Sequence, residues 1–253
     1  SESTLRVDVG LLDHVMALIK ELGLVRNQLA ERTTQDETLA LASQQLDRLT
    51  NELHQSLLKT RVQAIGTVWN RFPRIVRDLA IICGKKVEVE LSGTATELDR
   101  TIIEAIKDPL THLVRNSVDH GLESPEVRVA SGKSATGRLR LDAYREGNQV
   151  SLEVADDGSG INLERVRQTA LERQLVSSEM LSKMADQEVM QLIFAPGFST
   201  AQKVTTISGR GVGMDVVKTN IERIGGTVEL RSEAGKGTTI KIKLQPRLEE
   251  RAP

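Results

Sequence analysis

The chain has little of several features that mark common classes of protein. Only 2% of its 253 residues are aromatic, which argues against a single-stranded nucleic-acid binder, because such proteins stack bases on aromatic rings. Its formal net charge of −1 gives no general basic bias toward nucleic acid or anionic membranes. No run approaches the roughly 20 apolar residues of a membrane span, and the first residues lack a signal-peptide pattern.

Cysteine is equally scarce. A single residue, Cys83, excludes a disulfide within the chain, and a reducing, cytoplasmic location is the simplest expectation. Cys83 follows an apolar run, so we predict that it packs in the core.

The first quarter of the chain carries a heptad pattern. Its apolar residues repeat in alternating steps of three and four, which predicts two long helices paired as an antiparallel hairpin. Two helices bury too little surface to be stable alone, so residues of about 5–60 are expected to form a four-helix bundle with a second copy. The alternative is that the hairpin packs against the rest of its own chain. The two series are Leu11, Val15, Leu18, Leu22, Val25, Leu29 and Leu39, Ala42, Leu46, Leu49, Leu53.

Two histidines lie on these helices, where a histidine could accept a phosphoryl group. Neither His14 nor His54 stands in the Glu/Asp, Leu-Arg-Thr-Pro-like context that is typical of such acceptors. Ordinary solvated helix positions are the better interpretation of both.

The rest of the chain alternates helices and strands without a regular β-α-β repeat. Residues 61–66 have the character of a linker, and a helix from Asn70 to Gly84 should turn Ile75, Val76, Leu79 and Ile82 inward. Further helices are predicted at 96–120, 163–174, 186–194 and 212–224. Strands are predicted at 87–91, 139–145, 150–155, 227–231 and 238–244. The expected fold class is α+β, with the hairpin followed by an α/β sandwich whose mixed sheet carries helices on one face.

Residues 112–120 place three polar side chains on one predicted helical face. His112, Asn116 and His120 are spaced i, i+4, i+8. An asparagine carbonyl can give Mg²⁺ one oxygen ligand while triphosphate oxygens and waters supply the others. Taken alone, the segment is also explained as a solvated polar stripe.

Three glycine-bearing segments follow. Asp156, at the end of a strand and followed by Gly158 and Gly160, could accept a hydrogen bond from the exocyclic amine of adenine. Gly209, Gly211 and Gly213 precede an amphipathic helix, whose first backbone amides suit phosphate oxygens. This segment fits neither a Rossmann fingerprint nor a Walker loop. Residues 235–239 close the series, and an ordinary turn would explain them equally well.

Together these segments resemble, in their order, the signature of the GHKL ATP-binding family of gyrase, MutL, heat-shock chaperone ATPases and histidine kinases. Within that family, residues 108–121 resemble the asparagine box of the chemotaxis kinase CheA and its hybrid relatives. The hairpin, residues 61–63 and residues 70–74 resemble the dimerisation domain and junction of that kinase. The resemblance covers the chain from about Leu5 to Leu244. It implies three parts: a dimerisation domain at 1–63, an ATP-binding catalytic domain at 64–247 and a tail at 248–253.

The resemblance also implies roles for single residues. Asp156 would bind the adenine amine with Thr238 nearby, Asn116 would ligate Mg²⁺ with His112 as a possible second ligand, and Arg115 and His120 would lie near the phosphates. The segment of about 160–209 would form a lid. The remaining residues expected to contact ATP are Gly158, Gly160, Ser199, Thr200, Gly209, Arg210, Gly211, Val212, Gly213 and Met214.

One position separates a kinase from an ATPase. Hydrolysing members of the family place a water-activating glutamate four residues before the Mg²⁺ asparagine, and here that residue is His112. The resemblance therefore implies a histidine kinase with slow intrinsic hydrolysis, which passes the γ-phosphoryl group of ATP to a histidine on a separate phosphotransfer domain. A gyrase- or MutL-type ATPase is disfavoured for the same reason. The alternative is a nucleotide-binding dimeric scaffold without kinase activity.

The expected partners follow from the same resemblance. They are a second copy of the chain and a phosphotransfer domain, with no nucleic acid and no membrane insertion. Residues 245–250 do not resemble the start of the regulatory domain that binds coupling protein and receptors. Coupling to those proteins is therefore expected only through a domain that this chain lacks.

Overall fold

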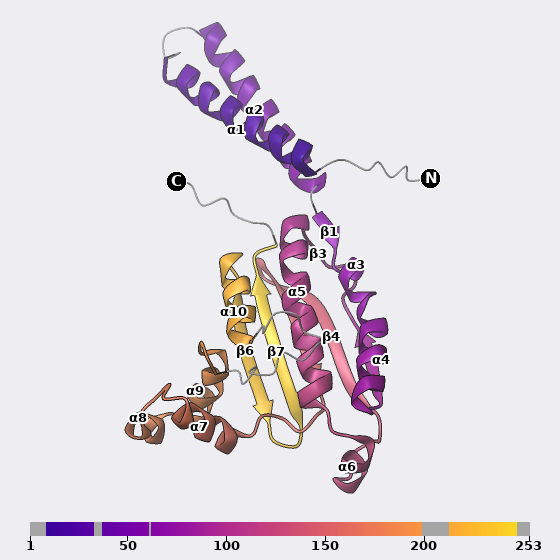
Figure 1. Ribbon diagram of the computed structural model, residues 1–253. Helices are drawn as coiled ribbons and strands as arrows, with labels where there is room; N and C mark the ends of the chain where they lie inside the picture. Colours follow the sequence, from indigo (N-terminus) through magenta and orange to yellow (C-terminus); the bar gives the residue numbers. More distant parts are fainter. Residues whose placement is uncertain (1–8, 33–36, 61, 199–212, 247–253) are drawn as a thin grey trace. The chain divides into compact units, whose positions relative to one another are not determined.

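The computed structural model describes residues 9–32, 37–60, 62–198 and 213–246. The chain divides into two compact units, Ser1–Val62 and Gln63–Pro253, and each is described by itself (Figure 1). No described helix combines the length and the apolar character that crossing a bilayer requires.

The first unit is the predicted hairpin. Its helices are α1 (Val9–Arg32) and α2 (Glu37–Thr60). On α1, Met16 and Ile19 are buried, while Leu12, Gly23 and Arg26 are half-buried, and Arg26 forms an ion pair with Asp47 of α2 at 2.5 Å. Val15 is half-buried as well, so the side of α1 that faces α2 follows residues 12, 15, 16, 19, 23 and 26. This seam shares Val15 with the one that the heptad predicted and otherwise lies next to it.

The predicted heptad residues mostly remain at the surface of the single chain. The described ones include Leu11, Leu18, Leu22, Val25, Leu49 and Leu53, whose exposed fractions run from 38% to 55%. We call these six residues the heptad surface.

The second unit begins with a short segment that is anchored in the fold. Strand β1 (Val62–Ala64) pairs with β3 (Glu97–Asp99), and α3 (Gly66–Trp69) follows. Ile65 and Trp69 are fully buried, with Phe72 beside them. The expectation that residues 61–66 form a linker is therefore wrong for 62–66, because these residues contribute backbone pairs and core side chains.

A five-stranded mixed sheet forms the centre of this unit. The strand order is β2 (Val87–Leu91), β4 (Gly137–Glu146), β5 (Gln149–Asp156), β7 (Gly237–Leu244), β6 (Thr227–Glu233). The β2–β4 pair is parallel and the other pairs are antiparallel. Along β4, buried and more exposed residues alternate, as expected for a sheet with one covered face.

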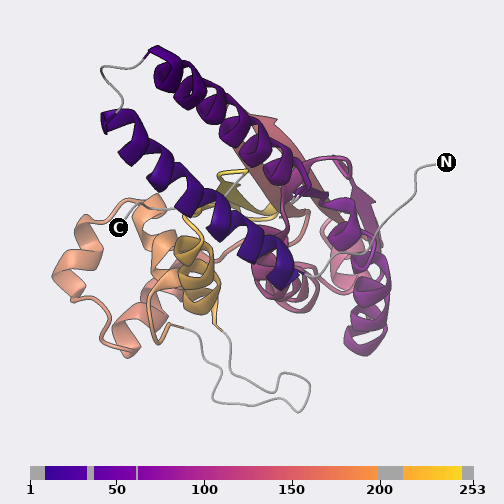
Figure 2. The same cartoon turned by 90° about the horizontal axis from the view of Figure 1, so that it is seen from above.

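Three helices cover that face. They are α4 (Phe72–Cys83), α5 (Arg100–Asn116) and α10 (Met214–Arg223), and both views show them on the same side of the sheet (Figures 1 and 2). Asp99 caps α5 by accepting from the backbone N–H of Thr101 at 2.8 Å. The core between these layers includes Ile102, Ile106 and Leu113 of α5, all fully buried.

Smaller helices occupy the connections. Helix α6 (Pro125–Ala130) precedes β4, whereas α7 (Leu163–Glu172), α8 (Ser178–Lys183), α9 (Asp186–Gln191) and the 3₁₀ segment η2 (Leu192–Phe194) follow β5. The helices after β5 share a satellite core around Val166, Leu181 and Val189. The sequence did not predict α3, α6 or α8, because helices of four to six residues carry too few turns to show periodicity.

Three local expectations need correction. Residues 96–120 are not one helix: β3 precedes α5, and the last turn is the π-helix η1 (Ser117–Gly121). Ile82 is 64% exposed and does not face inward, whereas Ala80 is buried. Cys83 is half-buried instead of packed in the core, with its thiol 3.8 Å from the Asp119 carboxylate.

Candidate functional site

The asparagine box spans the end of α5 and the π-helix η1. His112, Arg115 and Asn116 lie in the last two turns of α5 and are half-buried. A π turn contains about one more residue per turn than an α-helix. His120 lies in this turn and is exposed, with 76% of its side chain in solvent, and its Nε2 lies 3.6 Å from the Asp119 carboxylate.

The π turn is held from outside by a lysine. Lys85, just after α4, donates to the carbonyls of Val118 at 2.8 Å and Asp119 at 2.6 Å. These contacts satisfy carbonyl groups at the end of a helix, where they lack intrahelical partners.

The start of α10 lies against the asparagine box. The amide nitrogen of Asn116 is 3.2 Å from the sulfur of Met214, and Gly213 is the N-cap residue of α10. Burial lowers the pKa of His112, helped by the nearby charges of Arg115 and His120 and opposed by Asp215 of α10. A neutral imidazole is thus favoured at this position, which is the form that can bind a metal.

Asp156 is the buried carboxylate of the site. It ends β5 with only 9% of its surface exposed, and Oδ1 accepts from the backbone N–H of Gly158 at 3.1 Å. Burial raises the pKa of Asp156, while hydrogen bonds from Gly158, the Ser117 side chain and the Thr238 backbone oppose that rise. Ser117 is the residue after Asn116, so the carboxylate is bonded directly to the asparagine box.

The glycines after Asp156 allow the chain to approach itself closely. A Cβ at Gly158 would lie 2.1 Å from the carbonyl oxygen of Gly121, and one at Gly160 (φ +71°) would lie 2.3 Å from that of Glu233. Both contacts are too short for any side chain. The lack of a side chain at these two positions therefore lets the loop after Asp156 pack against the asparagine box and against the β6–β7 turn. The sequence did not predict these contacts.

The expected ATP-contacting residues divide into two groups. A connected region, formed by the end of α5, η1, the end of β5 with the loop after it, the start of β7 and the start of α10, holds Asn116, His112, Asp156, Gly158, Gly160, Gly213, Met214 and Thr238. The other group lies outside the described residues and comprises Ser199, Thr200, Gly209, Arg210, Gly211 and Val212.

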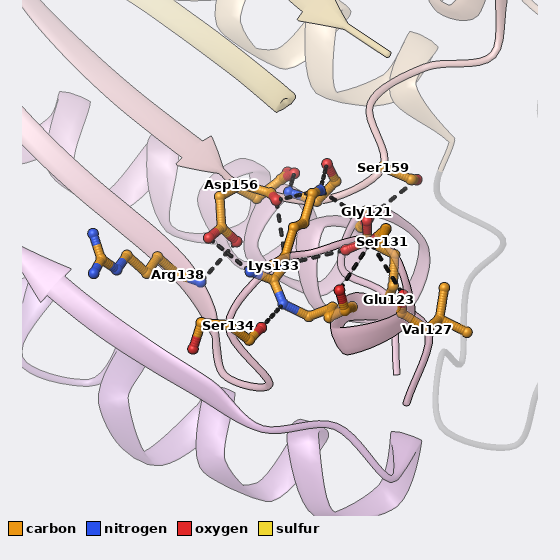
Figure 3. Close-up of polar contacts among 12 residues, drawn as sticks. Gly121, Glu123, Val127, Ser131, Lys133, Ser134, Arg138, Asp156 and Ser159 are labelled. Atoms are coloured by element: carbon orange, nitrogen blue, oxygen red, sulfur yellow. Dashed lines mark hydrogen bonds and ion pairs between the residues drawn. The ribbon is translucent and has the colours of Figure 1, made fainter. Parts of the chain in front are cut away.

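The sequence argument missed one cluster. Arg128 and Lys133 lie between the asparagine box and β4, both pair with Glu123, and both donate to backbone carbonyls of residues 157 and 158. Figure 3 shows Glu123 and Lys133 in this cluster. Arg128 is only 1% exposed. Charged residues are usually solvated, and the sequence carries no pattern that marks this arginine as buried.

The residues present fit the groups that the motifs imply. A buried carboxylate at a strand end can accept a hydrogen bond from the amine of adenine. The raised pKa of Asp156 reflects a site that water does not fully solvate. Among the described residues, no group of three or more His, Cys, Asp or Glu side chains could hold a metal ion by itself. Asn116 offers one amide oxygen, which suits an ion that takes its remaining ligands from phosphates and water.

Comparison with known families gives two matches. Residues 105–248 match the family model described as histidine kinase-, DNA gyrase B- and HSP90-like ATPase. The chain belongs to this ATPase family. Residues 2–60 match the homodimeric domain of signal-transducing histidine kinases. The expected α+β fold of the GHKL type is confirmed, and the family is one that uses ATP.

Similar curated proteins extend this result. The chain is 49% identical to the chemotaxis protein CheA of Klebsiella aerogenes, over 96% of this chain and 38% of the relative. It is 46% identical to the sensor histidine kinase CheAY of Helicobacter pylori (96% of this chain, 32% of the relative). It is 42% identical to CheA of Bacillus subtilis (95% and 36%).

The predicted resemblance to the CheA family is confirmed by these relatives. The chain spans about a third of their length.

Proposed function

We propose that this chain is the ATP-binding catalytic core of a CheA-like histidine kinase of two-component signalling. The γ-phosphoryl group of ATP would pass to a histidine on a separate phosphotransfer domain. The bond between the β,γ-bridging oxygen and the γ-phosphorus breaks and leaves ADP, a nitrogen–phosphorus bond forms on the imidazole, and the attacking ring gives up a proton. The observation that carries the proposal is the buried Asp156 carboxylate bonded to the asparagine box through Ser117.

In this proposal the two ends of the site have different tasks. Asp156 and Thr238 bind the base, and Asp156 accepts a hydrogen bond from the adenine amine. Asn116 holds Mg²⁺, with His112 beside it, and Arg115 and His120 meet the phosphates. Mg²⁺, when bound, neutralises charge on the triphosphate. Gly213 and Met214 open α10, whose first amides suit a phosphate oxygen.

His112 favours transfer over hydrolysis. A kinase must keep ATP from reacting with water until the acceptor arrives, and catalysis of phosphoryl transfer consists mostly of positioning and charge neutralisation. Burial lowers the pKa of the His112 imidazole, which makes it a weaker base than an ordinary histidine. We therefore expect slow ATP hydrolysis by this chain alone.

We further propose that residues 1–63 and 64–247 act as separate dimerisation and catalytic domains, followed by a tail at 248–253. The match to the homodimeric domain of histidine kinases supports homodimerisation, and the exposed heptad surface supports a four-helix bundle as its form. The cytoplasmic location and the link to chemotactic receptors through other domains stay predictions.

Transphosphorylation tests the proposal directly. The chain is incubated with γ-labelled ATP, Mg²⁺ and a separate histidine phosphotransfer domain, and label on that domain is measured over time. We expect transfer by the parent and at least a hundredfold slower transfer by Asn116→Ala, because the metal loses a protein ligand. Asp156→Ala should lose nucleotide affinity.

Two results would count against the proposal. Binding of ATP without transfer to any acceptor would favour a nucleotide-dependent dimeric scaffold, and fast hydrolysis without an acceptor would favour an ATPase.

A further inference from the structure

Two basic side chains hold the loop that follows Asp156. Lys133 donates from Nζ to the carbonyl oxygens of Asp157 at 2.9 Å and Gly158 at 2.7 Å. Arg128 donates from NH1 to the same Asp157 carbonyl at 3.2 Å, and NH2 lies 2.8 Å from the Asp157 carboxylate. Figure 3 shows Lys133 among these contacts.

The peptide between Asp157 and Gly158 links these cations to Asp156. Its carbonyl oxygen accepts from Lys133 and Arg128, and its N–H donates to Oδ1 of Asp156 at 3.1 Å. In a planar trans peptide the C=O and N–H bonds point in opposite directions. Fixing the oxygen therefore fixes the direction of the N–H, and with it one oxygen of the Asp156 carboxylate.

The two cations are themselves held tightly. Glu123 pairs with Lys133 at 2.8 Å and with Arg128 at 3.0 Å, and Arg128 also donates to the Ser134 carbonyl at 2.7 Å. Two cations are thus balanced by two carboxylates, Glu123 and Asp157. Burying an arginine this completely costs stability unless every charge is paired and hydrogen-bonded, and here the paired network ends on the backbone beside Asp156.

We propose that Lys133 and Arg128 are positioning residues that orient the base-binding carboxylate of Asp156 through the Asp157–Gly158 peptide. This inference rests on the proposed role of Asp156 in binding adenine. Within the described part of the site, these contacts of the network lie at its base end. Asn116 and His112 interact instead with Met214 and Asp215 of α10.

Other elements share the task of holding Asp156. Ser117 of η1 and the backbone of Thr238 on β7 also hydrogen-bond the carboxylate. Loss of Lys133 would loosen only the hydrogen bond from Gly158, one of the three to this carboxylate, so we expect a partial loss of adenine recognition. Losing one hydrogen bond to a charged group corresponds to about tenfold in affinity.

The test is a double-mutant cycle on the whole chain with two ligands. Affinities for ADP and for purine riboside 5′-diphosphate, which lacks the exocyclic amine, are measured by calorimetry for the parent, Lys133→Met, Asp156→Asn and the double variant. Lys133→Met should weaken ADP binding about tenfold and change binding of the amine-free ligand less than about twofold. In the Asp156→Asn background it should have no further effect, because the carboxylate it orients is gone.

Matched variants control for the loss of a buried lysine. Lys241 on β7 is also mostly buried and bonded to a carboxylate, Glu146, at 2.7 Å. Lys241→Met should therefore leave ADP affinity unchanged. Lys133→Arg, which keeps the charge and several donors, should restore affinity to within about threefold of the parent. Circular dichroism checks folding, and Lys133→Gln replaces Lys133→Met if the latter does not fold.

The outcomes separate this inference from the function on which it rests. Unchanged ADP affinity in Lys133→Met, or an equal loss for both ligands, overturns the positioning role while leaving the adenine assignment standing. A loss that persists in the Asp156→Asn background overturns it as well. If Asp156→Asn itself binds ADP as well as the parent, the base assignment and this inference both fall.

Discussion

The two units of this chain differ in how completely their apolar residues are buried. In the second unit, Ile102, Leu113 and Leu152 are fully buried between the sheet and its helices. In the first unit, Leu11, Leu18 and Leu49 are each about half exposed or more, at 55%, 49% and 50%. The second unit completes a core with its own residues, whereas the described residues of the hairpin leave a row of their own leucines uncovered.

This difference shows what each unit needs. A sheet with three covering helices buries enough surface to be stable. A lone pair of helices does not, and exposed leucines in heptad register are the ordinary seam of a larger bundle. The match of residues 2–60 to a homodimeric domain agrees with this interpretation. If the two units are independent, substitutions in the first should change dimerisation and substitutions in the second should change nucleotide binding.

The largest expected effect is on association through the heptad surface. Replacing Leu18 and Leu49 together by lysine should weaken the dimer at least a hundredfold, because charges would be buried in an apolar seam. ADP binding should stay within about twofold of the parent. Analytical ultracentrifugation measures the first quantity and calorimetry the second.

Gln44→Lys serves as the control, since Gln44 is an exposed polar residue of α2. It should leave the dimer intact. A double leucine variant that remains dimeric would place the dimer contact elsewhere.

The next effect concerns the buried carboxylate of the second unit. Asp156→Asn should reduce ADP affinity at least about tenfold, because an amide cannot replace a carboxylate as acceptor for the amine. Burial raises the pKa of Asp156, so the ionised form costs stability at neutral pH, and the variant should melt at the same temperature as the parent or higher.

The same pKa shift predicts a pH dependence of binding. ADP affinity of the parent should fall as pH drops through the raised pKa of Asp156, which happens at a higher pH than for an exposed aspartate. A variant that loses both affinity and melting temperature would show that Asp156 acts mainly in folding.

The smallest effect is on the pH dependence of stability. The pKa of His112 is lowered in the folded chain, so between that value and about 6.5 the unfolded chain binds more protons. Stability from this group is present above that window and is lost as pH falls through it. His112→Gln should therefore flatten the decline in melting temperature between pH 7.5 and pH 5.5.

An unchanged slope in His112→Gln would mean that burial of His112 has no effect on stability.

Much of the second unit could be predicted from local pattern. The alternation in 87–91 and 150–155 and the capping Gly84 correctly placed β2, β5 and the end of α4. The asparagine box and Asp156 were recognised because their residue types are unusual at those spacings. Arg128 and Lys133 were missed, because nothing in residues 123–133 distinguishes a buried cation from a solvated one.

The sequence also could not predict the geometry of a single helical turn. His120 was expected in the same α-helix as His112 and Asn116, but it lies in a π turn whose carbonyl groups accept hydrogen bonds from Lys85 at the end of α4. Lys85 lies far from His120 in the sequence, so the helical repeat could not reveal it.

The sequence by itself determined the heptad hairpin, the strands, the order of the site motifs and the family. Each helix, strand and single motif depends on residue types within a few positions of one another, and the family on the order of the motifs along the chain. Tertiary structure decided which side of α1 faces α2, that the asparagine box ends in a π turn, and which lysine reaches the Asp157–Gly158 peptide. These features depend on contacts between segments distant in the chain, because a buried charge or an extra residue in a turn is stable only where such partners meet it.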